Sequence, residues 1–542
     1  MQENNNLSVL VVDPNPGMRA SLQTMLNQSG INKIEYAVNS GTAIRQLSRR
    51  GYDIILCEYD LGGSTGDGQD GQQLLEDLRH HKLIGLATIF IMLTSEGVYS
   101  KVVSAAELTP TDYILKPFTV DALSARIARA LERRAAFLPA WQLVAQDKLR
   151  EALRACDKGE SAHPRHGAEF ARLRAELHVA LKEFAQAESV YEAVLAIKPL
   201  GWAGLGLART QFALGRVDDA RDTLEKLLGA NPRLMAAYDL LARCYEALGQ
   251  HGAAQKVLEE AVSISPHMVR RLRKLGEVAY EAGDLGASEK SFKQVVTKAR
   301  YSEFRDPEDH VNLVKTLVKR GDAQQAIGVV RDLERSLRGN PNVDACKAIC
   351  NAMVHEAAGD DAAALNDLRQ AASAVGASSG LSPNLRLGLV RSCLAHRLDE
   401  QASEVMLAVI NDVDSGVTMD QAMGVFEKAG RSDLADGMGQ QLQAQAQVLL
   451  GVADEKRNMG DVRGAVQTLL EALHLAPSNL QVMLAVVGGI LRQINEMGWD
   501  HPLGEVCVAQ LEKLRAVDPN HPRLTALVDE YQAAQRKYGI SG

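Results

Sequence analysis

The sequence has no excess of positive charge. Its 60 Lys and Arg residues are outnumbered by 68 Asp and Glu residues, which gives a formal net charge of −8 and a pI near 6.0. Nucleic acids and anionic lipid surfaces attract proteins through clustered positive charge. The charge balance therefore disfavours DNA or RNA binding, and we expect no nucleic-acid partner.

Cysteine is sparse, and long apolar runs are missing. The seven cysteines are scattered through the 542 residues, which is typical of reduced thiols in a cytoplasm rather than of a disulfide framework. Apolar stretches such as residues 482–491 are far shorter than the ~20 residues that span a bilayer. The first residues, MQENNNLSVL, lack the basic region and apolar stretch of a secretory signal. We therefore predict a cytoplasmic chain without membrane insertion.

Motifs for common catalytic chemistry are also missing. We find no nucleophile elbow, no Walker loop and no zinc-protease motif. Cys346 and Cys350 are four residues apart, but no second pair accompanies them, so buried core thiols are favoured over half of a zinc site. The pair His80 and His81 has no acid or cysteine at ligand spacing and is interpreted as surface. We predict no enzymatic activity and no metal centre.

Residues 1–134 alternate short β-rich runs with longer amphipathic segments. The five strand candidates, each followed by a helical pattern, are residues 8–12, 33–37, 53–57, 88–93 and 112–115. Five β-α units predict a parallel sheet covered by helices on both faces. Ligands and chemistry in such sheets lie at the carboxyl ends of the strands. The residues that follow each strand are therefore the candidates for a site.

Further along the chain the strand rhythm stops and a repeat begins. Small residues recur with spacings of 33, 34 and 34 at Ala187, Ala220, Ala254 and Ser288. A helix-turn-helix period of about 34 residues is the tetratricopeptide signature, and the sequence resembles that family. Later alanines are 38 positions apart, which indicates longer turns or helices; these are Ala326, Ala364 and Ala402. We count roughly nine units, by their fit to the 34-residue period.

The best-matched unit ends at Pro266, and a clear late unit contains Ala465. In the first of these units, the residues at consensus packing positions include Tyr238, Leu241, Ala242, Tyr245 and Ala254. One helix pair does not bury its own apolar stripe, so neighbouring pairs bury it jointly and their first helices line a concave groove. Grooves of this kind bind peptides or helices of partner proteins.

These rhythms divide the chain into four parts. The parts are an α/β domain at residues 1–134, a helical connector at 135–167 with a loop at 159–167, helical repeats at 168–477, and a C-terminal repeat with capping helices at 478–542. We expect a superhelical, all-α solenoid after the first domain.

The strand ends of the first domain carry a distinctive set of residues: LVVDPN, ILCEYD, IMLTSE and YILKPF. This set resembles the receiver domain of bacterial response regulators across residues 7–134, which implies a flavodoxin-like fold. In that family an aspartate after strand three accepts a phosphoryl group, and acids after strand one hold Mg²⁺. The resemblance assigns Asp13 to the first acid, Thr94 to the switch hydroxyl, Lys116 to the phosphoryl-binding lysine and Tyr113 to the switch aromatic.

Two positions depart from the family pattern. Pro14 stands where the second acid is expected, and Glu58 stands at the phosphoacceptor position. Proline has no side-chain oxygen, so Asp13 is only a weak remnant of a metal site, and we expect no cofactor and weak or absent Mg²⁺ binding. The glutamate carboxylate lies one methylene further out, which spoils the positioning on which phosphoryl transfer depends. We predict that this receiver is not phosphorylated.

Glu58 leaves three hypotheses open. Its longer side chain places negative charge within reach of Lys116 and Thr94, which would mimic phosphate constitutively. In the second hypothesis, Glu58 is an inert residue in a scaffold. In the third, phosphorylation persists on Glu58 or Asp60. The Gly- and Asp-rich segment at residues 60–74 lacks the spacing of a calcium loop and predicts a surface loop.

The sequence predicts a two-component-type signalling adaptor that acts by protein contact. Partners are expected in the repeat groove and on the receiver face formed by its fourth helix, fifth strand and fifth helix, which also offers a surface for a homodimer. The alternative is a phosphoryl-accepting response regulator for a histidine kinase, with an output mediated by the repeats.

Overall fold

The computed structural model describes residues 6–62, 70–95, 110–266, 268–299, 305–377, 380–412, 415–518 and 521–538. Residues 63–69 of the predicted surface loop, and residues 96–109 in the region of the receiver's fourth helix, lie outside these ranges. The chain divides into two compact units, Met1–Arg320 and Gly321–Gly542.

The first unit begins with a parallel sheet. Its strands are β1 (Ser8–Val12), β2 (Lys33–Ala37), β3 (Ile54–Glu58), β4 (Ile89–Ser95) and β5 (Asp112–Lys116). They are ordered β2-β1-β3-β4-β5, and every neighbouring pair is parallel. This order is that of flavodoxin-like sheets. The prediction of a five-stranded α/β domain is confirmed.

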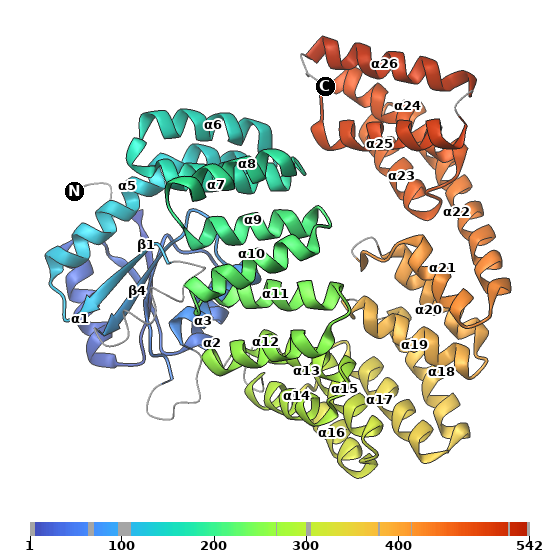
Figure 1. Cartoon of the computed structure of the whole chain (residues 1–542), viewed down its shortest axis with the longest axis horizontal. Helices are drawn as coiled ribbons and strands as arrows, with labels where there is room; N and C mark the ends of the chain where they lie inside the picture. Colours follow the sequence, from blue (N-terminus) through green and yellow to red (C-terminus); the bar gives the residue numbers. More distant parts are fainter. Residues whose placement is uncertain are drawn as a thin grey trace. The chain divides into compact units, whose positions relative to one another are not determined.

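Helices cover both faces of this sheet because its strands alternate apolar side chains between the faces. Leu10 and Val12 pack toward α2 (Ser40–Leu47) and α3 (Gly71–His80). Val9 and Val11 pack toward α1 (Pro16–Gln28) and α5 (Val120–Ala145). Figure 1 shows this layered domain in blue, with β1 and β4 between the two sets of helices.

The predicted connector is more regular than its composition indicates. Helix α5 continues without an end at residue 134, and it is followed by α6 (Leu149–Ala162) and a short 3₁₀ turn, η3 (Pro164–His166). The prediction of a loop over residues 159–167 is therefore wrong for most of that stretch. Gly159 does not break α6; a Cβ at this position would lie 2.5 Å from the Phe170 ring, so the glycine permits close packing.

Helix pairs make up the rest of the first unit. They are α7 (Gly167–Ala180), α8 (Phe184–Ile197), α9 (Gly201–Ala213), α10 (Val217–Ala230), α11 (Met235–Ala247), α12 (His251–Ile264), α13 (Val269–Glu281) and α14 (Leu285–Ala299), followed by α15 (Glu308–Lys319). Gly215, Gly249 and Gly283 turn the chain within three pairs, with φ of 77°, 72° and 85°. Glycine adopts this left-handed conformation without steric cost, which explains its recurrence at the turn.

The second unit is entirely helical in its described residues. Its helices are α16 (Ala323–Ser336), α17 (Val343–Ala358), α18 (Asp361–Ala377), α19 (Pro383–Ala395), α20 (Asp399–Asn411), α21 (Met419–Lys428), α22 (Ser432–Asn458), α23 (Val462–Leu475), α24 (Leu480–Met497), α25 (His501–Val517) and α26 (Pro522–Tyr538). Ala326, Ala364 and Ala402 are fully buried in α16, α18 and α20. The wider spacing of these alanines is therefore accommodated within continued helix pairs.

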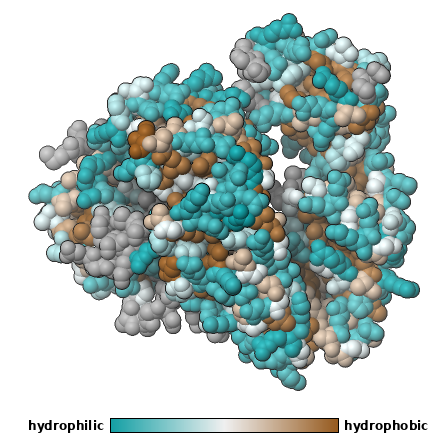
Figure 2. All heavy atoms as spheres, viewed as in Figure 1, coloured by the Kyte–Doolittle hydropathy of each residue, from teal (hydrophilic) through white to brown (hydrophobic). Residues whose placement is uncertain are grey.

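The visible surface carries no band of apolar residues. On the face shown in Figure 2, hydrophilic side chains predominate and apolar ones are interspersed among them. Among the described helices, none has the length and apolar character needed to cross a membrane.

Candidate functional site

Parallel pairing brings the predicted site residues to one edge of the sheet. Glu58 is the last residue of β3, Thr94 lies near the end of β4, and Lys116 is the last residue of β5. Asp13 directly follows β1. Because all strands run the same way, their carboxyl ends meet at this edge.

A lysine ammonium group joins two carboxylates there. Lys116 Nζ donates to Glu58 Oε2 and lies 3.2 Å from Asp13 Oδ2. The side chains of Asp13, Glu58 and Lys116 are 1%, 13% and 22% exposed. A charged contact with so little solvent around it is stronger than an exposed surface pair. The peptide bond between Lys116 and Pro117 is cis.

The polar atoms of the turn after β1 form hydrogen bonds within the protein. Asp13 Oδ1 accepts the Asn15 backbone N–H at 2.8 Å, so both carboxylate oxygens of Asp13 have partners. Arg19 donates to the backbone carbonyls of Asp13 and Pro14 at 2.7 and 3.0 Å. These contacts place a guanidinium and an ammonium group around the oxygens that a cation would need.

Few oxygens at this edge of the sheet are left without a partner for a Mg²⁺ ion. The ion requires near-octahedral oxygen ligands, usually with one or two carboxylates among them. Here Pro14 offers only a backbone carbonyl, which Arg19 already contacts, and the nearby carboxylates share Lys116. Within the described ranges, no three His, Cys, Asp or Glu side chains gather as a metal site.

The remaining receiver positions have separate partners. Thr94 is fully buried, and its hydroxyl donates to the Ser95 carbonyl at 3.4 Å. Asp60 is exposed; its backbone N–H donates to Glu58 Oε1 at 3.1 Å, and its carboxylate accepts the Gly62 N–H at 3.2 Å. The structure therefore brings Asp13, Glu58 and Lys116 together and leaves the Asp60 carboxylate turned toward its own loop.

Tyr113, the predicted switch aromatic, is half-buried on the sheet face covered by α2 and α3. It lies close enough to Tyr59 and Arg79 to influence the pKa of each. Of the predicted docking face, the region of the fourth helix lies outside the described residues, whereas β5 and α5 are described. The predicted aromatic is thus next to α3, a helix that the sequence did not single out.

The predicted repeat positions are packing residues. The alanines Ala187, Ala220, Ala254 and Ala465 are at most 5% exposed, in α8, α10, α12 and α23. Tyr238, Leu241 and Ala242 are buried along α11. Tyr238 also donates to Glu260 Oε1 at 2.9 Å, and Tyr245 donates to Glu225 Oε1 at 2.6 Å. The two tyrosines therefore tie α11 to α12 and to α10.

Comparison with known proteins agrees with both parts of the chain. The model of the response regulator receiver domain matches residues 9–128, and tetratricopeptide repeat models match residues 178–244 and 236–268. The chain therefore carries a receiver domain followed by tetratricopeptide repeats.

Relatives and solved structures share one part each with this chain. The chemotaxis protein CheY-3 of Vibrio cholerae is 26% identical over 130 residues, covering 24% of this chain and 95% of the relative. A receiver domain protein from Clostridium thermocellum has a TM-score of 0.21 at 20% identity, covering 24% of this chain and 97% of its own. A tetratricopeptide repeat protein from Parabacteroides merdae has a TM-score of 0.31 at 15% identity, covering 44% of this chain and 91% of its own.

The structure adds a contact that sequence reasoning missed. Gln73 and His80 of α3 form hydrogen bonds with Ser265 and Arg270 of the repeats. His80 was interpreted as surface, and it is exposed, yet its ring nitrogen lies against a repeat arginine. The spacing of polar residues along α3 was visible in the sequence, but such spacing is equally typical of a solvated helix face.

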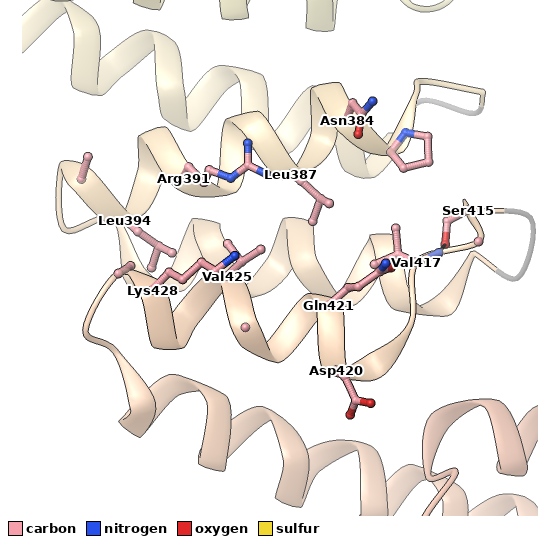
Figure 3. Close-up of a pocket in the computed structure, with 15 residues that line it drawn as sticks. Asn384, Leu387, Arg391, Leu394, Ser415, Val417, Asp420, Gln421, Val425 and Lys428 are labelled. Atoms are coloured by element: carbon pink, nitrogen blue, oxygen red, sulfur yellow. Dashed lines mark hydrogen bonds between the residues drawn. The ribbon is translucent and has the colours of Figure 1, made fainter. Parts of the chain in front are cut away.

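The second unit contains a separate cavity of about 1000 Å³ between α19 and α21. Figure 3 shows apolar side chains such as Leu387 and Val425 along it, with the Arg391 and Lys428 side chains beside them. Asp420 points away from the other labelled side chains (Figure 3). The lining of the cavity therefore mixes apolar and basic side chains.

Proposed function

We propose that this chain is a signalling adaptor of the two-component type that acts by protein contact and takes no phosphoryl group. The observation that carries the proposal is the contact between Glu58 and Lys116, at the position where receivers bind a phosphoryl group. Asp13 shares the same ammonium group. The pocket thus contains its own anion, and the lysine that would bind the incoming group is already neutralised.

Electrostatics and positioning both support this proposal. Phosphoryl transfer depends on an in-line nucleophile and on cations that neutralise the developing charge. Glu58 is held by Lys116 and by the Asp60 backbone, so its carboxylate is fixed by internal hydrogen bonds. Without an acid at position 14, the turn after β1 supplies one carboxylate, which is itself bonded on both oxygens. In this proposal Glu58 supplies the negative charge that phosphate gives other receivers.

The output in this proposal is binding of a protein by the repeats, without catalysis. Tetratricopeptide repeats generally present a concave surface to peptides or helices. All seven cysteines are free and buried, which agrees with the proposed cytoplasmic location. A homodimer remains one of the proposed assemblies.

Phosphorylation of the full chain tests the proposal. The protein is incubated with acetyl phosphate and Mg²⁺, and its intact mass is measured. We expect no added phosphoryl mass on the wild-type chain. The double variant Pro14→Asp, Glu58→Asp restores the acid pair and the shorter acceptor, and it is expected to gain acid-stable, base-labile phosphoryl mass.

A matched control separates the candidate acceptors. Asp60→Asn removes an exposed carboxylate and is expected to change nothing. An adduct on the wild-type chain that disappears in Glu58→Gln or in Asp60→Asn would establish the phosphoryl-accepting alternative instead. Each result therefore assigns or removes one acceptor.

A further inference from the structure

Helix α3 has two distinct faces. Leu74, Leu75 and Leu78 are fully buried against the sheet. Gln73, Glu76 and His80 follow an i, i+3, i+7 spacing, which places all three on a second side of the helix. We call these three residues the α3 polar face.

The α3 polar face meets the junction between α12 and α13. Gln73 Nε2 donates to Ser265 Oγ at 3.4 Å, just after the end of α12. Arg270, in the first turn of α13, donates to His80 Nδ1 at 2.9 Å. Gln73 is only 3% exposed, which is unusual for an amide on the outer side of a receiver helix. The residues lie 192 and 190 positions apart in the chain, so the contact is a tertiary one.

Charge complements this contact at its centre. Glu76 is half-buried and lies near Arg271 and Arg270. Burial raises the pKa of Glu76 to about 7, and the two arginines act against this shift. A carboxylate on a solvated helix face would not be desolvated in this way. Arg271 and Arg270 of the repeats therefore lie close enough to attract the Glu76 carboxylate.

The neighbouring side of α3 approaches a different repeat. Burial lowers the pKa of Arg79 to about 10, with Arg172 nearby and Glu176 acting in the opposite direction. Arg172 and Glu176 belong to α7, whereas Arg270 belongs to α13. Both α7 and α13 are first helices of their pairs, which line the concave side of such repeats.

We propose that α3 of the receiver is an intramolecular ligand of the repeat groove, bound through Gln73, Glu76 and His80 as a helix in a groove. The contact is polar and charge-assisted, and it places one amphipathic helix between the sheet and the repeats. Its hydrogen bonds involve none of the oxygens of the Glu58 pocket, so the contact can be tested without phosphate. A partner helix that uses the α11–α13 part of the groove must displace α3.

Cross-linking of the full chain tests this proposal. His80→Cys and Arg270→Cys replace two contacting side chains, and all seven native cysteines are buried, so a short bis-maleimide reacts with the introduced pair. We expect a cross-link within one chain, identified by intact mass. The control pair His80→Cys, Lys226→Cys uses an exposed lysine of α10 and is expected to react about tenfold more slowly, because its effective concentration is lower.

A second substitution asks whether the observed charges hold the contact. Glu76→Arg in the His80→Cys, Arg270→Cys chain faces Arg271 with a like charge and is expected to slow the cross-link, while Glu76→Gln retains it. Equal rates for the test and control pairs, or an unchanged rate with Glu76→Arg, would overturn the proposal.

Hydrogen exchange tests the contact independently, in chains without introduced cysteines. In the full chain, amides around Ser265 and Arg270 are expected to exchange faster in Glu76→Arg than in the wild type, with unchanged helix content by circular dichroism. Identical exchange in the two proteins would contradict the docking of α3. Neither experiment involves phosphate, so its failure is separate from failure of the adaptor proposal.

Discussion

At the scale of single residues, Lys116 is the most consequential side chain of the receiver pocket. It alone neutralises Asp13 and Glu58 among the contacts described at this edge of the sheet. Lys116→Met is expected to destabilise the receiver by roughly 3 kcal/mol, because it leaves two poorly solvated carboxylates without their cation. Scanning calorimetry of the full chain measures this as a lower melting temperature of the receiver transition.

A matched lysine makes the Lys116 result specific. Lys33 is exposed on β2, and Lys33→Met is expected to change stability by less than about 0.5 kcal/mol. Glu58→Gln retains the Asp13 contact of Lys116 and is expected to lie between the two. Equal effects of Lys116→Met and Lys33→Met would mean that the ammonium group is not a structural part of the pocket.

Gly71 is the residue that brings α3 close to the pocket strand. A Cβ at this position would lie 2.5 Å from the Glu58 carbonyl oxygen and 2.8 Å from Met92 Sδ. Gly71→Ala is expected to cost about 1–3 kcal/mol through overpacking, measured by thermal unfolding. Gly85→Ala is the control, because a Cβ there has nothing within 4 Å. A neutral Gly71→Ala variant would show that α3 moves away from β3 without cost.

At the scale of elements, the strands were predictable and the outer faces of the helices were not. Apolar runs bounded by polar residues located all five strands, with β3, β4 and β5 differing by one or two residues at one or both ends. The helix over residues 149–162 was partly missed, because Gly159 is typical of a breaker and only its distance to Phe170 reveals a packing role. The sequence did not predict the contact of the α3 polar face, because polar residues have the same spacing along a helix whether water or another domain covers them.

Titration of Glu76 makes the α3 contact sensitive to pH. When α3 is docked, burial raises the pKa of Glu76 from 4.5 to about 7; Arg271 and Arg270 oppose the shift, and Asp239 and Asp70 add to it. Since the docked state favours the protonated acid, this contribution is complete below about pH 4.5 and is lost as the pH rises through about 7. Small-angle scattering is expected to detect a weaker α3 contact above pH 7, where the ionised Glu76 keeps the attraction of the two arginines, and Glu76→Gln is expected to remove this weakening.

Titration of His80 has the opposite pH dependence and weakens the docking of α3 at acidic pH. Burial and the neighbouring Arg270 and Arg273 lower its pKa from 6.5, while Asp77 opposes the shift, and its neutral ring accepts the Arg270 hydrogen bond. This contribution is present above about 6.5 and is lost as the pH falls through the lowered pKa. Docking is therefore expected to weaken on both sides of mildly acidic pH. His80→Gln should abolish only the acidic loss, and a pH-independent wild type would contradict both assignments.

At the scale of the whole molecule, the division into a receiver and repeats followed from sequence, but their connection did not. The receiver pocket and the repeat contact lie on adjoining structure: the Gly71 N–H donates to the Tyr59 carbonyl at 2.7 Å, immediately after Glu58. Asp70, which caps α3, also pairs with the Tyr59 hydroxyl, and Arg233 of the repeats lies near the same ring. A contact of this kind depends on residues far apart in sequence, which no local periodicity encodes.

An exchange of charge between receiver and repeats tests this connection most directly. Glu76→Arg and Arg270→Glu each place like charges together and are expected to release the receiver and raise the radius of gyration of the full chain. The double variant restores opposite charges and is expected to return the radius toward the wild-type value. Residues that contact one another show coupling of about 0.5–3 kcal/mol in such a cycle, whereas distant residues are additive.

Two comparisons make the charge exchange decisive. Lys226→Glu changes the net charge as Arg270→Glu does, but at an exposed position on α10. Alone, it is expected to leave the radius of gyration unchanged. Combined with Glu76→Arg, its effect on the radius is expected to be additive. Circular dichroism confirms that each variant keeps its helices. Because Arg271 is bonded to Asp239 within the repeats, it is left intact, and the stack keeps that ion pair in every variant. A double variant as expanded as the single ones would mean that Glu76 and Arg270 do not interact.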